Sequence, residues 1–470
     1  MNGVLSALKN KLQSKVVKAG IAYVIGSILL KGIAFLSTPL FSNLMSTSEY
    51  GAYGTYLSYE SIMNIVIALG VANSVRNAAI DYKEDVDSYV ASMLKLITIP
   101  FFVFILLVNC AYSMGISISG FSRIVLNALV CHSFASAVIE IVSISYSIRF
   151  KSKQYLLISF SCSVLNIISS VFLMLTVLSG NRFSARVYGL AGTYSFVAIV
   201  LYIKKAFCDK NVINTQYCRY ALKIGIPMIA FYIGYSLLNT FDRVMISEMC
   251  GNSEAGIYSF AYNIANILNI IVTAIFTAWV PWFYERIEVE EFEIIYHRQI
   301  KLIQLVLFGT IVFSLCSPEF IRFMAPSSYS DGGYIVPVLI GGMYMIFVYN
   351  FLGYTELYYK KIIYLTIGTW IATIINIVLN YYFIAIFGYY AAAYTTFFSF
   401  LLLFIAHRVI VYIKFGKNHV IYNLHDIKSI VLLSIFILLA VVFKDNIFVR
   451  YSLIAAVAGV EVLLYSQSTT

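Results

Sequence analysis

Charged residues are scarce in this 470-residue chain. Asp, Glu, Lys and Arg together make up 11% of it, whereas hydrophobic residues make up 61%. Soluble domains contain about 25% charged and about 45–50% apolar residues, so a soluble fold of this length could not cover its surface with polar groups. Apolar runs of about 20 residues, long enough to cross a hydrocarbon core of ~30 Å, recur from Gly20 to Ser466. The composition therefore predicts an integral membrane protein with many spans.

Cysteine, histidine and tryptophan are also few, with seven, five and three copies. The cysteines show no C-x-x-C spacing and no Cys/His cluster, which excludes the usual patterns of a zinc site or a disulfide framework. The net charge of +10 follows the loops rather than a basic stripe on a soluble domain, so it does not indicate nucleic acid as a partner. We expect neither a metal nor an organic cofactor.

The first 19 residues form a segment of their own. Lysines as far as Lys18 interrupt it, and no apolar core with a cleavage site follows, so it does not read as a cleavable signal peptide. Leu5, Leu8 and Leu12 share one helical face and the lysines lie elsewhere. This pattern predicts, for residues 1–19, an interfacial helix on the cytoplasmic surface of the membrane.

Hydropathy and loop charge predict fourteen spans with both termini in the cytoplasm. Of the 32 lysines and arginines, 24 fall in alternate loops beginning with the N-terminal segment, and 6 fall in the opposite loops. A missed span would invert this bias downstream of it, and all the loops are short. The predicted spans are residues 20–42, 55–77, 92–114, 122–148, 154–178, 187–206, 223–248, 255–283, 301–317, 333–358, 362–382, 386–412, 427–443 and 449–466.

An internal repeat indicates two matched halves. The hexapeptide SEYGAY at residues 48–53 recurs as SEAGIY at residues 253–258. Because this offset spans six helices, an even number, the two halves should be parallel repeats with a substrate path between them. We predict an all-α architecture with an N-terminal lobe at 20–210 (spans 1–6), a C-terminal lobe at 211–415 (spans 7–12) and accessory spans 13–14 at 416–470.

Polar stripes at helical spacing predict a wet central path. Lys31 lies near the middle of its span, too deep for easy snorkelling, so it should face the bundle interior or a cavity. The stripe from Tyr258 to Thr277 extends over nearly the whole bilayer core, which favours a passage over helix packing. The predicted lumen cations are Lys31, Arg243 and Arg76. The predicted cavity-lining residues are Ser27, Ser61, Asn64, Tyr232, Ser236, Asn239, Tyr258, Tyr262, Asn266, Asn269 and Thr273.

Each cation also has a second interpretation. Lys31 could pair with a buried glutamate, Arg243 could snorkel to the outer surface, and Arg76 could be a positive-inside anchor. An anionic group such as a diphosphate would be attracted by any of them that faces the lumen.

Three titratable residues are candidates for ion coupling. His132 and Glu140 lie within one arc of about 80° on their span, and such pairs are typical of proton relays. The alternative is a polar packing face in which Glu140 is bound to a cation. Asp242 points away from its neighbouring arginine and should have a separate partner. Glu60 and Glu356 lie nearer the span ends, where we expect them at the interface.

Three segments carry a family resemblance: GSILLKGIAFLSTPLFSNLMSTSEYGAYGTY at 26–56, ALKIGIPMIAFYIGYSLLNTFDRVMISEMCGNSEAGIYSFAYNIANIL at 221–268, and FTAWVPWFYE at 276–285. They resemble the Wzx-type O-antigen and capsule repeat-unit flippases, which belong with the MATE multidrug exporters and the lipid II flippase. The resemblance implies a MATE-like fourteen-helix fold in the bacterial inner membrane. It also implies lumen cations, here matched by Lys31 and Arg243.

The same resemblance implies the function. The substrate would be an undecaprenyl-diphosphate-linked oligosaccharide, moved from the cytoplasmic to the outer leaflet for O-antigen (lipopolysaccharide) or capsule assembly. Alternating access coupled to H⁺ or Na⁺ is expected, with a polysaccharide polymerase and a chain-length regulator as partners.

Two other functions are open. A MATE-type multidrug or cation antiporter needs an acidic group for its cargo, whereas Lys31 favours an anionic one. A polysaccharide polymerase or ligase needs a sizeable outer loop with convergent catalytic groups, and no loop here has them. The sequence therefore predicts a transporter and not an enzyme.

Overall fold

The structure, a computed structural model, describes residues 26, 32–33, 35–116, 120–206, 213–416 and 425–469, with side chains as far as Gly459. Every regular element in these residues is a helix, which confirms the predicted all-α class. Residue contacts divide the chain into two compact units. Unit 1 comprises Met1–Ser37 and Thr55–Ser236, and unit 2 comprises Thr38–Gly54 and Leu237–Thr470.

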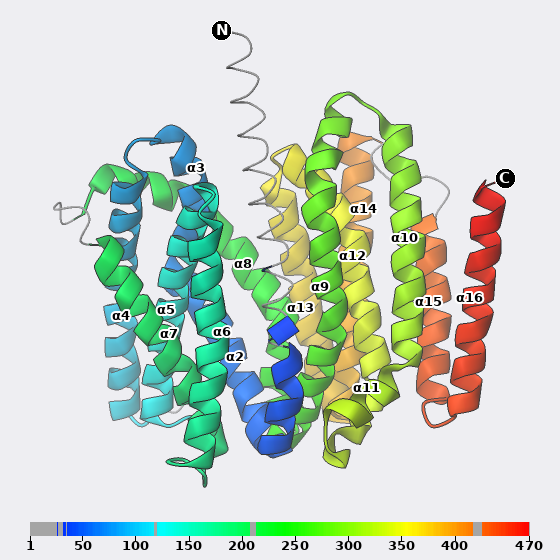
Figure 1. The fold of residues 1–470 in the computed structure, drawn as a ribbon, viewed down its shortest axis with the longest axis horizontal. Helices are drawn as coiled ribbons and strands as arrows, with labels where there is room; N and C mark the ends of the chain where they lie inside the picture. The colour runs from blue at the N-terminus through cyan, green and yellow to red at the C-terminus, as the bar shows by residue number, and fades with distance from the viewer. Residues whose placement is uncertain are drawn as a thin grey trace. The chain divides into compact units, whose positions relative to one another are not determined.

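Four long helices form the body of unit 1 (Figure 1): α4 (Val86–Ser113), α5 (Arg123–Ile148), α6 (Ser152–Leu175) and α7 (Arg182–Ala206). The centre of this body is α5, which contacts the other three helices. Its N-terminus is capped by Ser122, whose side chain accepts a hydrogen bond from the backbone of Val125. The buried core consists mainly of Val, Ile, Ala and Tyr side chains from α4, α5 and their neighbours.

A glycine bends the second predicted span. Helix α2 (Thr47–Ala68) turns by 58° into η1 (Val71–Asn73) and α3 (Ser74–Asp81). Gly70, at the bend, has φ 62°, a left-handed conformation that favours glycine. A Cβ atom at Gly70 would also lie 2.6 Å from the carbonyl oxygen of Gly225 in α8 (Thr215–Met249). The segment predicted at 55–77 is therefore a broken span, because both the backbone angle and the close approach require glycine.

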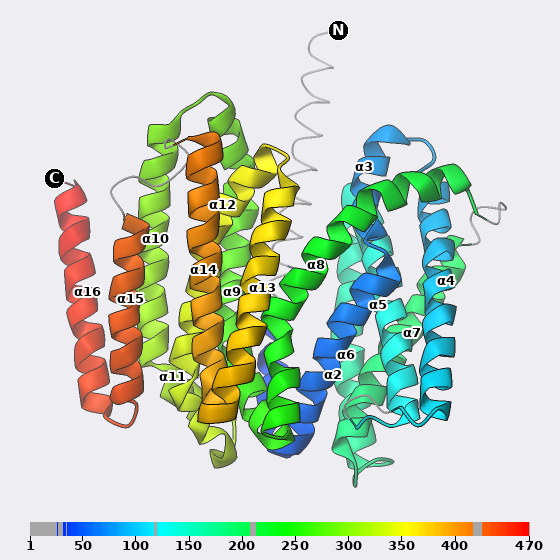
Figure 2. The same ribbon diagram turned by 180° about the vertical axis from the view of Figure 1, so that it is seen from behind.

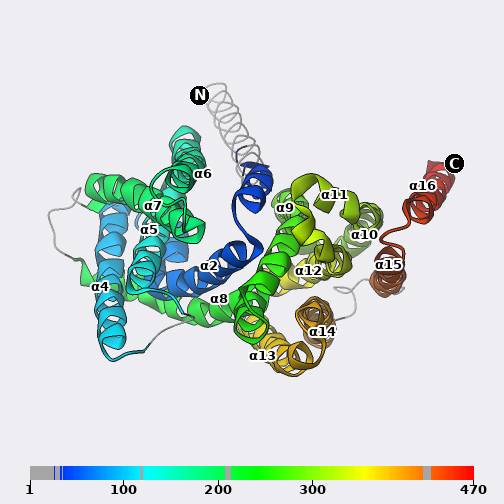
Figure 3. The same cartoon turned by 90° about the horizontal axis from the view of Figure 1, so that it is seen from below.

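Unit 2 is built around α12 (Val336–Tyr358), of which nearly every residue is buried. It contacts helices on several sides, and Figures 2 and 3 show their arrangement. The other helices of unit 2 are α9 (Asn252–Glu288), α10 (Phe292–Leu315), α11 (Ser317–Met324), η2 (Ser327–Tyr334), α13 (Ile362–Phe387), α14 (Tyr390–Phe415), α15 (His425–Val442) and α16 (Ile447–Thr469).

The two copies of the repeated hexapeptide lie against each other. They form the first turns of α2 and α9, and the hydroxyls of Thr47 and Ser253 are 2.7 Å apart. A Cβ at Gly51 would lie 1.8 Å from the carbonyl oxygen of Asn252, and one at Gly256 would lie 1.9 Å from that of Thr47. The repeated glycines therefore allow reciprocal backbone contact between the two helix N-termini.

The protein is a multi-pass membrane protein. Eleven helices in the described residues are long and apolar enough to cross a bilayer, and the bent α2–α3 pair is a twelfth. Most of the predicted first span and the interfacial helix at 1–19 lie outside the described residues. The fourteenth predicted span corresponds to α16, which is described with side chains only to Gly459.

The contact units do not follow the predicted lobe boundaries at 210/211 and 415/416. The division falls inside α2 and α8 instead, because the start of α2 packs with unit 2 and the start of α8 packs with unit 1. Helices α15 and α16 both contact α10 and belong to unit 2.

Candidate functional site

Asp242, on α8, is enclosed in the core of unit 2. Its carboxyl group is 1% exposed and accepts hydrogen bonds from side chains on three other helices. The donors are the hydroxyl of Tyr258 on α9 (2.6 Å), the hydroxyl of Thr396 on α14 (2.6 Å) and the amide of Asn380 on α13 (2.7 Å). All three donors are neutral, so they satisfy the carboxyl oxygens without cancelling a negative charge.

A polar stripe on α13 extends this cluster. Its residues follow the helical spacing i, i+4, i+7, i+11 on an otherwise apolar helix. They are Thr369, Thr373, Asn376 and Asn380, and all are fully buried. The side-chain nitrogen of Asn376 and the hydroxyl of Thr369 have no hydrogen-bond partner in the part of the chain that the structure describes. Of these four residues none was among the predicted site residues, although their spacing is visible in the sequence.

The cluster offers oxygen atoms to a hard ligand. A carboxylate, a threonine hydroxyl and asparagine carbonyls provide oxygen ligands, which hard cations prefer. The carboxylate can also bind a proton. The described residues contain no group of three or more His, Cys, Asp or Glu that could hold a metal ion. The binding of a coupling ion at this site stays a prediction.

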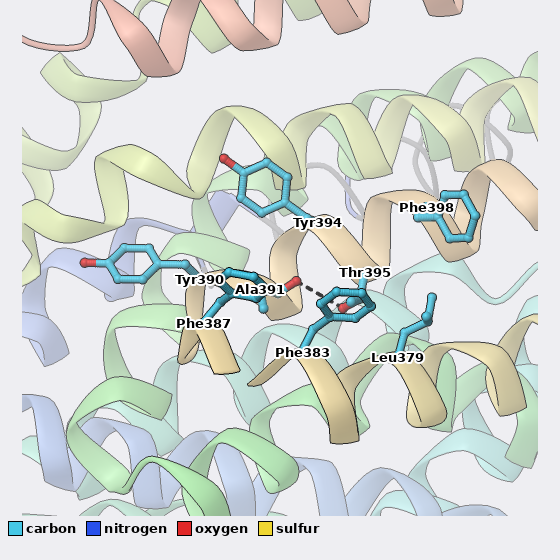
Figure 4. Close-up of a pocket in the computed structure, with 8 residues that line it drawn as sticks. All are labelled: Leu379, Phe383, Phe387, Tyr390, Ala391, Tyr394, Thr395 and Phe398. Carbon is cyan, nitrogen blue, oxygen red and sulfur yellow. Dashed lines mark hydrogen bonds between the residues drawn. The ribbon is translucent and has the colours of Figure 1, made fainter. Parts of the chain in front are cut away.

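A groove of about 610 Å³ lies between α13 and α14 (Figure 4). Its lining residues are Leu379, Phe383, Phe387, Tyr390, Ala391, Tyr394, Thr395 and Phe398. Thr395 is the link between this groove and the Asp242 cluster: its hydroxyl hydrogen-bonds the amide oxygen of Asn380 and lies 3.2 Å from the carbonyl oxygen of Ala391. One side chain thus borders both the apolar groove and the polar cluster.

Arg243, the neighbour of Asp242, lies on a tyrosine ring. Its guanidinium carbon is 4.3 Å from the ring centroid of Tyr262, close enough for a cation–π interaction. The hydroxyl of Tyr262 donates to the amide oxygen of Asn239 at 3.3 Å. Three predicted residues, Arg243, Tyr262 and Asn239, are therefore brought together in unit 2, with both interactions on one side of α8.

The rest of the predicted α9 stripe changes from buried to exposed along the helix. Tyr258 is 0% exposed and Tyr262 is 6% exposed, whereas Thr273 lies at the surface. Asn269 donates to the amide oxygen of Asn266 at 3.1 Å, and Thr273 donates to the carbonyl oxygen of Asn269. Tyr258 thus belongs to the Asp242 cluster, and the role of the other four as cavity lining stays a prediction.

In unit 1, the buried His132 lies beside Glu60. Glu60, expected at the interface, has a side chain only 14% exposed and lies 4.0 Å from Nδ1 of His132. The ring of Tyr56 stacks on the imidazole with centroids 6.0 Å apart. Glu60 was misjudged because α5 covers its position on α2. His132 therefore shares its surroundings with Glu60.

Glu140, on α5, has an exposed side chain and forms no ion pair within 4.0 Å in the described residues. The hydroxyl of Tyr232, on α8, accepts a hydrogen bond of 3.1 Å from Asn73. The roles of Glu140, Arg76 and Tyr232 stay predictions.

Three further predicted residues lie at helix contacts of unit 1. The hydroxyls of Ser61 and Ser236 are 2.8 Å apart, and Asn64 donates to the backbone carbonyl of Ser133 at 3.1 Å. Lys31 and Ser27 lie outside the described residues, so their roles stay predictions.

The comparison with known families identifies the chain. The family model described as "Polysaccharide biosynthesis protein" matches residues 16–286, more than half of the sequence. This chain belongs to the polysaccharide biosynthesis protein family. The matched region includes α2 through most of α9, and so it contains Asp242, Tyr258 and His132.

The chain is similar to an uncharacterized membrane protein of Haemophilus influenzae. The two sequences are 25% identical over 285 residues, a match that covers 58% of this chain and 66% of the relative. That match spans slightly less than two thirds of the relative's length.

The solved structures share the fold. A lipid II flippase, MurJ, in an inward closed conformation superposes with a TM-score of 0.73 at 14% identity, covering 96% of this chain and 99% of that one. An inward-facing multidrug resistance MATE family transporter superposes with a TM-score of 0.59 at 14% identity, covering 82% and 98%. The predicted MATE-like fold is confirmed.

Proposed function

We propose that this polysaccharide biosynthesis protein is a Wzx-type flippase. It moves an undecaprenyl-diphosphate-linked oligosaccharide from the cytoplasmic to the outer leaflet of the bacterial inner membrane, for O-antigen or capsule assembly. Both termini lie in the cytoplasm, as the loop charges indicate. A polymerase and a chain-length regulator then use the product. Family membership supports the pathway, and a fold shared with two kinds of transporter supports transport rather than catalysis.

An anionic cargo fits the chain's polar residues. The lipid-linked sugar carries a diphosphate, which needs cations along its path, and the predicted lumen cations are Lys31, Arg243 and Arg76. The Arg243 guanidinium is held on the Tyr262 ring rather than in a carboxylate pair in the described residues. Its charge is therefore still able to attract an anion.

The observation that carries coupled transport is the enclosure of Asp242. A carboxylate in a residue that is 1% exposed, held by three neutral donors, is costly to keep charged in a medium of low dielectric constant. A proton or a Na⁺ ion would neutralise it. Ion occupancy would then alter the packing of four helices, α8, α9, α13 and α14. We propose that this is how an ion gradient drives alternating access.

Transport in proteoliposomes tests the proposal. The full-length protein is reconstituted with a fluorescent isoprenyl-diphosphate oligosaccharide, and Na⁺ and pH gradients are applied separately. We expect one gradient to accelerate translocation. Asp242→Asn should abolish that acceleration, because an amide carries no negative charge for a proton or Na⁺ to neutralise. Asp445→Asn is the matched control, since Asp445 is an exposed carboxylate outside this cluster.

Two outcomes would contradict the proposal. Wild-type protein that fails to translocate the lipid under either gradient would overturn the flippase assignment. Equal acceleration in wild type and Asp242→Asn would overturn the role of Asp242 alone. Overexpression that raises tolerance to cationic drugs, without any effect on surface polysaccharide, would support the multidrug antiporter instead.

A further inference from the structure

Two of the five histidines are buried beside a glutamate from another helix, and one of these pairs is completely enclosed. His407, on α14, lies with Nδ1 2.6 Å from Oε1 of Glu356 on α12, and both side chains are 0% exposed. Glu356 was expected at the membrane interface; in the structure it lies near the end of α12 with its side chain enclosed by protein. The pair lies in unit 2 but shares no residue with the Asp242 cluster.

Two atoms of the pair point at no partner. Oε2 of Glu356 and Nε2 of His407 make no hydrogen bond in the described part of the chain. On α13, Gly368 faces the imidazole, and a Cβ atom at that position would lie 2.3 Å from Nε2. Because Gly368 has no side chain, the imidazole of His407 can lie against the backbone of α13. Any larger residue at 368 would displace a rigid ring.

The groups around the pair provide no charge of their own in the described residues. On α12, the Tyr349 ring meets the imidazole edge-on with centroids 5.0 Å apart, and α13 presents Gly368. Arg408, the next residue on α14, is paired with Asp426 of α15. Among the described ion pairs, no lysine or arginine contacts Glu356.

Charge counting shows what the pair can bind. With one exchangeable proton, as Glu⁻ with HisH⁺ or GluH with neutral His, the pair has no net charge. Without that proton its charge is −1, and with a second it is +1. Either charge would be buried at 0% exposure with no counter-ion, which is strongly unfavourable. The enclosure of the pair therefore favours the state that holds one proton.

We propose that Glu356 and His407 form a proton-binding site of unit 2, separate from Asp242, that exchanges its proton only when α12, α13 and α14 part to admit water. Proton occupancy and the packing of these three helices are then linked. A proton gradient can act on the helices through this pair, whichever ion occupies Asp242. Only the physiological role rests on the proposed transport function; the binding of the proton does not.

Histidine NMR on the full-length protein in nanodiscs tests the site directly. With ring nitrogens labelled, we expect a hydrogen-bonded His407 signal whose proton exchanges with D₂O at least about tenfold more slowly than that of His297. His297 is the matched control because it pairs with Glu293 at 4.0 Å on the surface, where the two side chains are 66% and 89% exposed. His407→Gln assigns the signal.

The wild-type spectrum decides the proposal even if variants fold poorly. A ring proton of His407 that exchanges as fast as that of His297 would overturn it. Glu356→Gln should shift the hydrogen-bonded proton signal, because an amide oxygen is a weaker acceptor than a carboxylate, and Gly368→Ala should accelerate exchange by displacing the ring. In proteoliposomes, Glu356→Gln should weaken acceleration by a pH gradient while Asp242 is intact. If the wild type does not transport at all, the proposed function fails but the exchange result still stands.

Discussion

Asp242 accepts a hydrogen bond of 2.6 Å from the hydroxyl of Tyr258, and neither side chain is more than 1% exposed. The bond joins α8 to α9, and the bonds from Thr396 and Asn380 join α8 to α14 and α13. Because a buried carboxyl group must have its oxygens satisfied, this one residue fixes the mutual arrangement of four helices.

Removing partners from this cluster should have graded effects. Tyr258→Phe deletes one donor and keeps the ring, so we expect a loss of about 1–2 kcal/mol in unfolding free energy. Asp242→Ala leaves three buried donors without their acceptor and should destabilise the protein more than Tyr258→Phe does. Thermal unfolding of the purified protein in detergent measures both. Equal unfolding temperatures for Tyr258→Phe and wild type would show that the bond contributes nothing.

A coupling ion at Asp242 should also protect the folded protein. A ligand that binds only the native state stabilises it by RT ln(1 + [L]/Kd), which is about 2.7 kcal/mol at 100 times Kd. We expect either Na⁺, compared with choline at constant ionic strength, or mild acid to raise the unfolding temperature. The increase should be absent in Asp242→Asn. An identical increase in both proteins would mean that the ion binds elsewhere.

The repeated glycines at the starts of α2 and α9 predict a strong steric effect. In Gly51→Ala or Gly256→Ala the new methyl group meets backbone atoms of the partner helix within 2 Å. Backbone cannot move aside as a flexible side chain can, so we expect a loss of at least about 1–3 kcal/mol. Chemical denaturation in mixed micelles, with the yield of monodisperse protein, reports this loss.

Gly309 provides the matched control. It lies within α10 of unit 2, and a Cβ there meets nothing within 4 Å. Gly309→Ala should therefore stabilise the helix by about 0.5–1 kcal/mol. The opposite signs separate steric contact from helix propensity. Unchanged stability in Gly51→Ala would show that the two N-termini are not in close contact.

Hydropathy and loop charge were sufficient to predict the fold class, because each span needs its own apolar run. The site was harder. The sequence showed that Asp242 points away from Arg243, but its donors lie 16, 138 and 154 residues away in the chain. No local pattern links residues at such separations. The polar stripe on α13 was a local signal, and it could have pointed to the cluster.

The distance of a glutamate from the end of its helix was a poor guide to the burial of its side chain. Glu356 is close to the end of α12, yet it is 0% exposed, and His407 of α14 lies against it. Glu60 is likewise covered by α5, where His132 lies. Burial depends on which helices pack over a position, and that is a property of tertiary contacts rather than of distance from the span end.

Lys31 remains the cation on which the proposed anionic path most depends. In Lys31→Ala we expect surface polysaccharide to disappear while membrane insertion is unchanged, because the cargo's diphosphate loses its counter-charge. Immunoblotting of surface polysaccharide and of the membrane fraction measures the two effects. Lys31→Arg keeps the charge and should retain polysaccharide. Wild-type levels in Lys31→Ala would contradict the role of Lys31.

The ion pair between Glu319 and Arg450 predicts a pH dependence of stability. Arg450 is 1% exposed and binds both carboxyl oxygens of Glu319, at 2.5 and 2.6 Å, and the backbone carbonyl of Leu315. Burial alone would raise the pKa of Glu319, but the hydrogen bonds and charge of Arg450 outweigh it and hold that pKa below its ordinary value of 4.5.

A carboxyl group whose pKa is lowered by folding contributes stability above its ordinary pKa, and this stability is lost as the pH falls through the lower folded value. We therefore expect wild-type unfolding free energy to decline below pH 4.5 more steeply than that of Glu319→Gln. At pH 7 the variant should be less stable by about 2–3 kcal/mol, because it leaves the arginine charge buried; the loss is limited because Glu319 is 29% exposed. Glu293→Gln, whose carboxyl is 89% exposed, should follow the wild-type curve. Parallel curves for wild type and Glu319→Gln would show that the pair does not anchor α16 to α11.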